Sequence, residues 1–407
     1  MSCQTILLIG FWGSLGLICY AYAIFPLLLA GIARVYRARQ PLTPDDVPDE
    51  YLPCVAMIVA AHDEGAVLAA KLSNTWRLDY PAERFEILVG SDGSSDGTNS
   101  ILSSCQDPRL HAFPYEHRRG KISVLNELVQ QTDADIIVMS DANTMFAPNA
   151  VRKLVRHFSN PKVGCVSGVL SLELEGGVSG EGLYWKYEGW IKYNEGALGV
   201  LIGCNGGIYA MRRTLYDAPP PNTIVDDFVL SMNVIKQGFE VRLEPEAKAS
   251  EPPCPSSRAE MTRKIRIGAG GWQALGLTVS LLHPRFGVCA FAFWGHKVLR
   301  WLVPHLYLIM AAANVALARN PWYCGFLAAQ ALGVVMALLA YFSGSKFTLP
   351  RWSRPVSYFY IMNYALGCGF LRYLFKTQRV TWDRGVGACS ELLDGKACTI
   401  ASGRIDR

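Results

Sequence analysis

Hydrophobic residues along this chain form two patterns, long uninterrupted runs near both ends and short runs in the middle. The first long run, Ile6 to Ile32, carries no charge and exceeds the ~20 apolar residues that cross a bilayer. Basic residues (Arg34, Arg37, Arg39) follow this run and none precedes it, whereas a signal peptide has its basic residues in front. The pattern predicts an uncleaved transmembrane anchor. The positive-inside bias then places the amino terminus outside and the next domain in the cytosol.

Three further apolar runs lie near the carboxyl end, at 302–317, 322–342 and 356–375. Four full crossings would leave the carboxyl terminus outside, yet Lys376, Arg379 and Arg384 favour the inside. One of these runs is therefore a candidate re-entrant or interfacial segment, and the number of crossings stays open. We expect an integral protein of the plasma (inner) membrane whose central domain lies in the cytosol.

Between the membrane segments, short β-branched runs alternate with helical stretches. The predicted strands are 54–60, 85–90, 110–113, 136–140 and 163–168, and the predicted helices are 65–77, 98–104, 121–131 and 149–158. This alternation is typical of βαβ units, so the fold class is α/β with a mostly parallel sheet. Ligands of such sheets bind at the carboxyl ends of the strands, which gives acidic residues at those ends special weight.

These patterns divide the chain into six segments. They are an amino-terminal anchor (1–39), a linker with four prolines (40–53), a cytosolic α/β domain (54–257), an interfacial helix region (258–285), a carboxyl-terminal membrane region with about three apolar segments (286–376), and a tail (377–407). The net charge of +5 is spread along the chain rather than gathered into a stripe, so no nucleic-acid partner is expected. The twelve cysteines include no C-x-x-C pair, which gives no support for a zinc site or a disulfide framework.

Two acidic segments follow predicted strands. Asp92 begins a Gly- and Asp-rich turn and can accept from a ribose hydroxyl or a base N–H, although the same turn suits a helix cap. Asp141 and Asn143 are separated by one residue, so in an extended backbone their oxygens point the same way. That arrangement suits Mg²⁺ or Mn²⁺ bridging two phosphates, and a plain strand-end turn is the alternative.

Three more charged segments are candidates for chemistry. Lys121 starts a helix, where an anionic phosphate binds well, although a solvated basic turn fits too. The adjacent carboxylates of Asp226 and Asp227 repel each other, so one is a candidate general base, unless both simply complement a helix dipole. Arg263 and Arg266 share a helix face and can clamp a diphosphate, and they also suit an interfacial helix.

Taken together and in this order, the motifs resemble those of the inverting, membrane-integrated family 2 glycosyltransferases, which include cellulose, hyaluronan and chitin-type synthases and bacterial exopolysaccharide transferases. The resemblance covers residues 50 to 280. It implies a GT-A-type sheet flanked by helices, transmembrane helices at both ends, a metal-dependent transfer and a nucleotide-sugar donor. The expected carrier is UDP, with GDP left open.

The resemblance also implies a role for each matching residue. The implied donor-binding residues are Ala61, His62, Glu64, Asp92, Lys121, Asp141, Arg263 and Arg266, and the implied metal ligands are Asp141 and Asn143. The catalytic pair is Asp226 and Asp227, with Asp227 as the base. The acceptor-binding residues are Asn205, Gly206, Gly207 and Trp272.

Two departures from the family pattern limit what the resemblance implies. Asn143 replaces a usual carboxylate, and Ile267 replaces the tryptophan of the Q-x-x-R-W motif, which weakens the case for processive polymerisation. The expected acceptor is a growing polysaccharide or a lipid-linked sugar, with single addition to a lipid carrier as the alternative. An inactive scaffold relative and a membrane transporter remain as alternatives of another class.

Aromatic residues from Tyr184 to Tyr193 suit either sugar stacking or a bilayer surface.

Overall fold

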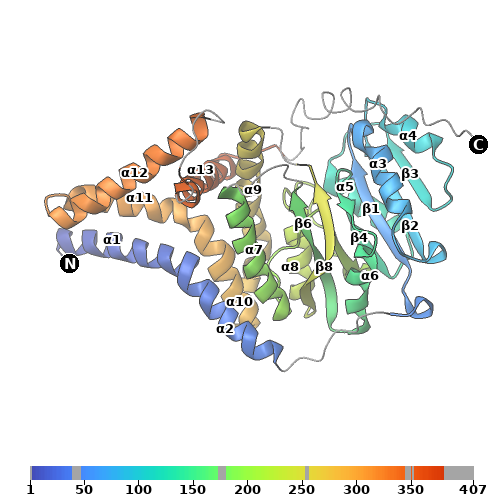
Figure 1. The fold of residues 1–407 in the computed structure, drawn as a ribbon, viewed down its shortest axis with the longest axis horizontal. Helices are drawn as coiled ribbons and strands as arrows, with labels where there is room; N and C mark the ends of the chain where they lie inside the picture. Colours follow the sequence, from blue (N-terminus) through green and yellow to red (C-terminus); the bar gives the residue numbers. More distant parts are fainter. Residues whose placement is uncertain are drawn as a thin grey trace, which may run out of the picture.

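The computed structural model describes residues 2–38, 47–172, 180–252, 256–343, 350 and 353–379. Half of the predicted linker and nearly all of the predicted tail lie outside these residues. The described chain forms a sheet domain on one side and a group of long helices on the other (Figure 1).

One mixed sheet of eight strands forms the centre of the sheet domain, in the order β3-β2-β1-β4-β7-β6-β8-β5. The strands are β1 (Val55–Ala61), β2 (Phe85–Asp92), β3 (Leu110–Tyr115), β4 (Ile136–Met139), β5 (Met145–Phe146), β6 (Val163–Leu172), β7 (Tyr209–Arg212) and β8 (Glu240–Glu251). The first four are mutually parallel, and β7 runs antiparallel to both β4 and β6. The sheet is therefore mostly parallel, as expected.

Both faces of the sheet are covered by helices, which explains why β1 is buried along its whole length. On one face Ile58 packs with α5 (Lys121–Leu128) and α8 (Asp226–Lys236). On the other face Met57 packs with α3 (Gly65–Trp76), α4 (Thr98–Ser104) and α6 (Ala150–Val155). The helices α5 and α8 begin at the carboxyl ends of the sheet, and this brings their first residues to the candidate site.

Three helices are long and apolar enough to cross a membrane within the described residues. They run from Cys3 to Arg37 (α1, Cys3–Cys19, and α2, Phe25–Arg37), from Val288 to Leu317 (α10, Val288–Phe293, and α11, Leu299–Leu317), and along α12 (Pro321–Ser343) to Phe342. In both of the first two, a π-helical segment (Tyr20–Ile24 and Trp294–Val298) joins the parts.

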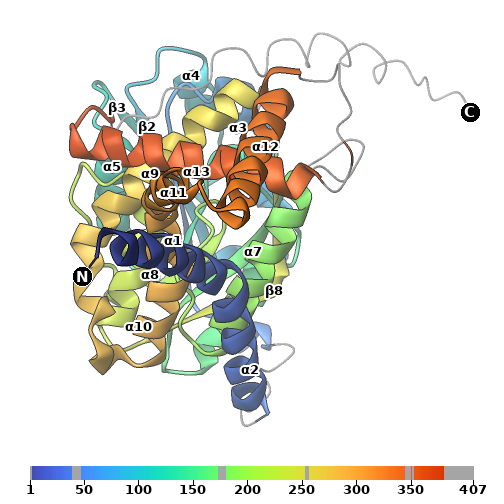
Figure 2. The same ribbon diagram turned by 90° about the vertical axis from the view of Figure 1, so that its left-hand side faces the viewer.

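The last apolar run forms α13 (Ser353–Leu374), which does not belong to this set of three. Figures 1 and 2 show that α1 and α11 extend away from the sheet domain, whereas α13 lies across them. It packs on α9 (Ser257–Thr278). A Cβ on Gly369 would lie 2.7 Å from the Ala269 backbone nitrogen, so the two helices meet backbone to backbone. The fourth apolar run thus packs along α9 rather than extending beside α1 and α11.

The helix α7 (Gly180–Ala197) connects the sheet domain to the membrane helices. Tyr187 donates a 2.7 Å hydrogen bond to the Tyr22 carbonyl, and Glu188 forms an ion pair with Arg300 at 2.9 Å. His296 bridges Glu188 and Glu195 with distances of 2.7 and 2.6 Å. This buried polar network fixes the orientation of α7 between the two parts of the protein.

Candidate active site

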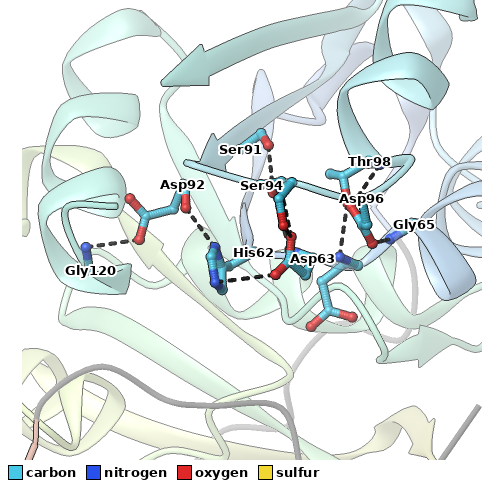
Figure 3. Close-up of polar contacts among 11 residues, drawn as sticks. His62, Asp63, Gly65, Ser91, Asp92, Ser94, Asp96, Thr98 and Gly120 are labelled. Carbon is cyan, nitrogen blue, oxygen red and sulfur yellow. Dashed lines mark hydrogen bonds and ion pairs between the residues drawn. The ribbon is translucent and has the colours of Figure 1, made fainter. Parts of the chain in front are cut away.

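The loops after β1 and β2 are held together at the carboxyl edge of the sheet (Figure 3). The His62 ring lies 2.7 Å (Nδ1) from the Asp92 carbonyl oxygen, and the Asp63 carboxylate accepts from the Ser95 amide at 2.7 Å. Asp96 accepts from the Gly65 amide at 2.9 Å, which links the second loop to the start of α3. Ala61 is buried at the end of β1. The predicted donor-binding segment is thus a rigid edge formed by two loops.

Asp92 lies in the middle of this edge with no exposed surface. Its carboxylate accepts from the backbone amides of Arg119 at 2.6 Å and Gly120 at 2.8 Å. These bonds fix the start of α5, where Gly120 takes a left-handed φ of 89°. In this structure Asp92 positions a helix start, and its contact with a nucleotide stays a prediction.

Lys121, the first residue of α5, connects two groups of acidic residues. Its Nζ lies 2.7 Å from Asp141 Oδ1 and 3.7 Å from Asp226 Oδ2. Burial alone would lower the pKa of Lys121, but Asp141, Asp226 and Asp227 outweigh burial and raise it. Lys121, Asp141, Asp226 and Gly206 line one small pocket together with apolar side chains from β1, β4 and α5. The structure therefore brings residues predicted from four separate segments into one place.

Asp227, next to this pocket, has an altered acidity. Burial and the neighbouring Asp226 raise its pKa from 3.8 to about 6, while Lys121 acts in the opposite direction. Gly206 faces this carboxylate, because a Cβ there would lie 3.1 Å from Asp227 Oδ2. A carboxylate with a pKa near neutrality has the acidity expected of a general base.

The predicted metal ligands lie at the end of β4. Asp141 and Asn143 are both partly exposed, and both offer the hard oxygen atoms that Mg²⁺ and Mn²⁺ prefer. The described residues contain no group of three or more His, Cys, Asp or Glu arranged for a metal. The residues fit a cation whose remaining ligands come from a diphosphate and water, which is common for Mg²⁺.

Arg266 of α9 reaches the same site. Burial lowers its pKa, and the carboxylates of Asp226, Asp141 and Asp227 act to raise it. The Nε atoms of Arg263 and Arg266 are buried and have no hydrogen-bond partner among the described residues. Both arginines thus retain donors for an anionic ligand.

The predicted acceptor residues lie in two different surroundings. Asn205 is fully engaged, because its amide nitrogen donates to the Gly168 carbonyl at 2.6 Å and its oxygen accepts from Lys192 at 2.7 Å. A Cβ on Gly207 would lie 2.6 Å from Glu251 Oε1. Trp272 packs between membrane-proximal helices, 4.9 Å from the Phe370 ring and 5.9 Å from the His305 ring. The acceptor role of all of these, and of Trp272 above all, stays a prediction.

The aromatic residues of α7 contact the neighbouring helices. Tyr184 lies 5.0 Å from the Tyr358 ring of α13, and the Arg37 guanidinium lies 4.7 Å above the Tyr193 ring. Trp190 and Tyr193 keep 39% and 44% of their surface exposed, as residues at a bilayer surface do.

Sequence reasoning missed three polar residues at the site. Glu251, at the end of β8, accepts from Thr144 at 2.5 Å, and burial together with Asp141 raises its pKa. Lys71 is fully buried behind β4, donates to Ser140 Oγ at 2.7 Å, and has a pKa lowered by burial to about 7. Lys192 approaches from α7. None of the three lies in a motif. Lys71, however, stands among the apolar positions of its helix, and a lysine at such a position indicates a buried polar contact.

A mixed sheet flanked by helices, with a pocket of basic and acidic residues at its strand ends, is an α/β architecture suited to an anionic ligand. Residues 56–217 match the family model "Glycosyl transferase family 2", so this segment carries the sequence pattern of that family. The resemblance inferred from the motifs is confirmed.

Two curated relatives share this region. The chain is 26% identical over 249 residues to a "Beta-monoglucosyldiacylglycerol synthase" of Synechocystis sp., covering 57% of this chain and 51% of that protein. It is 27% identical over 203 residues to a "Poly-beta-1,6-N-acetyl-D-glucosamine synthase" of Staphylococcus epidermidis, covering 47% and 48%. The chain thus spans about half the length of the curated relatives it matches.

A solved structure matches more of the chain. It is a mannosyltransferase, PcManGT from Pyrobaculum calidifontis, in complex with GDP-Man and Mn²⁺; the TM-score is 0.70, and the match covers 90% of this chain and 99% of that one at 22% identity. At this identity the likeness concerns the fold, which includes the membrane-proximal helices.

Proposed function

We propose that this protein transfers a sugar, with inversion at the anomeric carbon, from a nucleotide-sugar to a saccharide or lipid-linked acceptor at the cytosolic face of the membrane. The observation that carries this proposal is the position of Lys121, whose ammonium group links Asp141 on the predicted donor side to Asp226 beside the predicted base. Donor phosphates and acceptor hydroxyl would meet at this point.

The reaction is a single displacement. Asp227 takes the proton from an acceptor hydroxyl, and the oxygen forms a bond to the anomeric carbon. The bond between that carbon and the diphosphate oxygen breaks, and the diphosphate leaves with the electron pair. Lys121 and Arg266 stabilise the negative charge that develops on it. When bound by Asp141 and Asn143, Mg²⁺ or Mn²⁺ would neutralise part of the same charge.

The donor is a UDP-sugar or a GDP-sugar. The names of the three similar proteins support this range, because they include a glucosyl glycolipid synthase, an N-acetylglucosamine polymer synthase and a mannosyltransferase bound to GDP-Man. We favour a role in polysaccharide assembly at the cell surface, with single addition to a lipid carrier as the alternative.

The membrane arrangement follows from three crossings with α13 as an interfacial helix. With the amino terminus outside, three crossings leave both the sheet domain and the segment after α12 in the cytosol. Basic residues support this orientation, because Arg34 and Arg37 end α2 and Arg372 ends α13, while the short connection between α11 and α12 carries Arg319 alone.

The test is a donor panel. Detergent-purified protein with Mn²⁺ is incubated with UDP-glucose, UDP-N-acetylglucosamine and GDP-mannose, with a short oligosaccharide or a lipid extract as acceptor, and released nucleoside diphosphate is measured. We expect release with one donor in the presence of one acceptor class. Donor binding without release, in wild type as in Asp227→Asn, would instead identify an inactive scaffold, and solute flux in vesicles without a donor would identify a transporter.

A further inference from the structure

Lys192 lies on α7, the helix that joins the sheet domain to the membrane helices. Its side chain is partly buried, and its Nζ donates a 2.7 Å hydrogen bond to Asn205 Oδ1. Among the residues that the structure describes, Lys192 forms no ion pair, so no carboxylate in direct contact cancels its charge. None of the sequence motifs contains this residue.

The partner of Lys192 is the residue that anchors the turn before β7. The Asn205 backbone amide donates to Ser167 Oγ at 2.9 Å, and its side-chain nitrogen donates to the Gly168 carbonyl at 2.6 Å. With Lys192 as the third partner, hydrogen bonds hold both the backbone and the side chain of Asn205. The next residue is Gly206, which faces Asp227 Oδ2. The hydrogen bond of Lys192 therefore fixes a turn that lies against the base.

Lys192 also adds to the charges around Asp227. The groups that act on this carboxylate are Asp226 on its own helix, Lys121 from α5, Lys192 from α7, Arg266 from α9 and Tyr209 from β7. Lys192 acts to lower the pKa of Asp227, and Asp227 in turn acts to raise that of Lys192. Burial, followed by Lys297, lowers the pKa of Lys192, while Glu188 acts to raise it.

We propose that Lys192 is a positioning residue for sugar transfer: it holds the 203–207 turn against Asp227 and places a second cation, besides Lys121, near the base. This inference rests on the proposed function. Lys192 comes from the helix that packs on α2, so the geometry of the base depends on a residue that none of the sequence motifs contains.

The experiment compares three variants with the wild type, using the donor and acceptor that give turnover in the panel with Mn²⁺. Lys192→Met removes both the hydrogen bond and the charge, Lys192→Arg keeps the charge, and Lys186→Met removes an exposed lysine from the same helix. The measurements are kcat, the donor KM and the pH dependence of kcat/KM, together with the melting temperature.

We expect Lys192→Met to lower kcat by about 10- to 100-fold with little change in donor KM, because a misplaced base weakens the transition state rather than donor binding. The acid limb of its pH profile should move upward by about 0.5 to 1 pH unit, since a cation near Asp227 is lost. Lys192→Arg should restore the position of this limb, and Lys186→Met should match the wild type.

The inference is overturned if the acid limb of Lys192→Met does not move and its loss of kcat is no larger than the fraction of protein unfolded at the assay temperature. That result would leave the proposal of glycosyl transfer intact. Equal losses in Lys192→Arg and Lys192→Met would overturn the inference as well. Absence of turnover in the wild type with every donor would instead count against the proposed function, so the two failures are distinguishable.

Discussion

The sharpest prediction concerns Asp227, which should be needed for catalysis and yet destabilise the fold. Its pKa rises from 3.8 to about 6, so near neutral pH the folded state holds a carboxylate that is harder to ionise than in the unfolded chain. A shift of this size corresponds to at most roughly 3 kcal/mol, at 1.36 kcal/mol per unit. Because the folded-state pKa is raised, the fold loses this stability as pH rises from about 4 to about 6.

The test is Asp227→Asn. Its kcat should fall by at least ~100-fold, the usual contribution of a general base, while nucleotide binding stays nearly unchanged. Its melting temperature should exceed that of the wild type at pH 7.5, and the difference should shrink as pH falls through about 6 towards 4, where the wild-type carboxylate is protonated. In the wild type, kcat/KM should decline below about pH 6. Normal turnover in the variant would refute the assignment of the base, and a difference in melting temperature that does not change with pH would refute the electrostatic argument.

Three further predictions follow from the same pocket. Arg266→Leu should weaken nucleoside diphosphate binding and lower kcat, each by roughly 10-fold or more, with partial recovery in Arg266→Lys, as measured by calorimetry and turnover. Gly206→Ala should lower kcat by about 10-fold, because its Cβ would press on Asp227 from 3.1 Å, whereas Gly189→Ala, with no atom within 4 Å, should leave it unchanged. Chelation by EDTA should abolish transfer, Mn²⁺ or Mg²⁺ should restore it, and Asp141→Asn should raise the cation concentration needed.

Much of the parallel half of the sheet was predictable from sequence. The strands β1, β2 and β4 are almost entirely buried, and such strands are short apolar runs that stand out from the helices between them. The predicted and observed bounds agree within one or two residues, as for 85–90 against Phe85–Asp92.

In the other half of the sheet, β6 was predicted as 163–168, but β5, β7 and β8 were missed. The strand β8 has buried, intermediate and exposed positions in irregular order and carries four glutamates, so no apolar run marks it. The strand β7 has only four residues and runs antiparallel. Glu251 ends β8, which is why it escaped the search for acidic residues at strand ends.

The residues of the site also fall into two groups, those that were predictable from the sequence and those that were not. Residues inside motifs, such as Lys121 and Asp141, were found because their spacing carries information. Lys192 and Lys71 act through distant partners, and a single sequence does not reveal that α7 brings Lys192 to Asn205 across 13 positions. The burial of Asp92 was not predictable from the sequence either, because a turn that binds a ligand and a turn that holds a helix start have the same composition.

The backbone contact between α9 and α13 has a consequence for regulation. Where Gly369 meets Ala269 there is no side chain whose rotamer could absorb a displacement, so α13 and α9 shift together. Arg266 stands less than one turn away on α9, and its guanidinium moves with them. A displacement of α13 would therefore reach Arg266 through packed backbone alone, without any side chain to relay it.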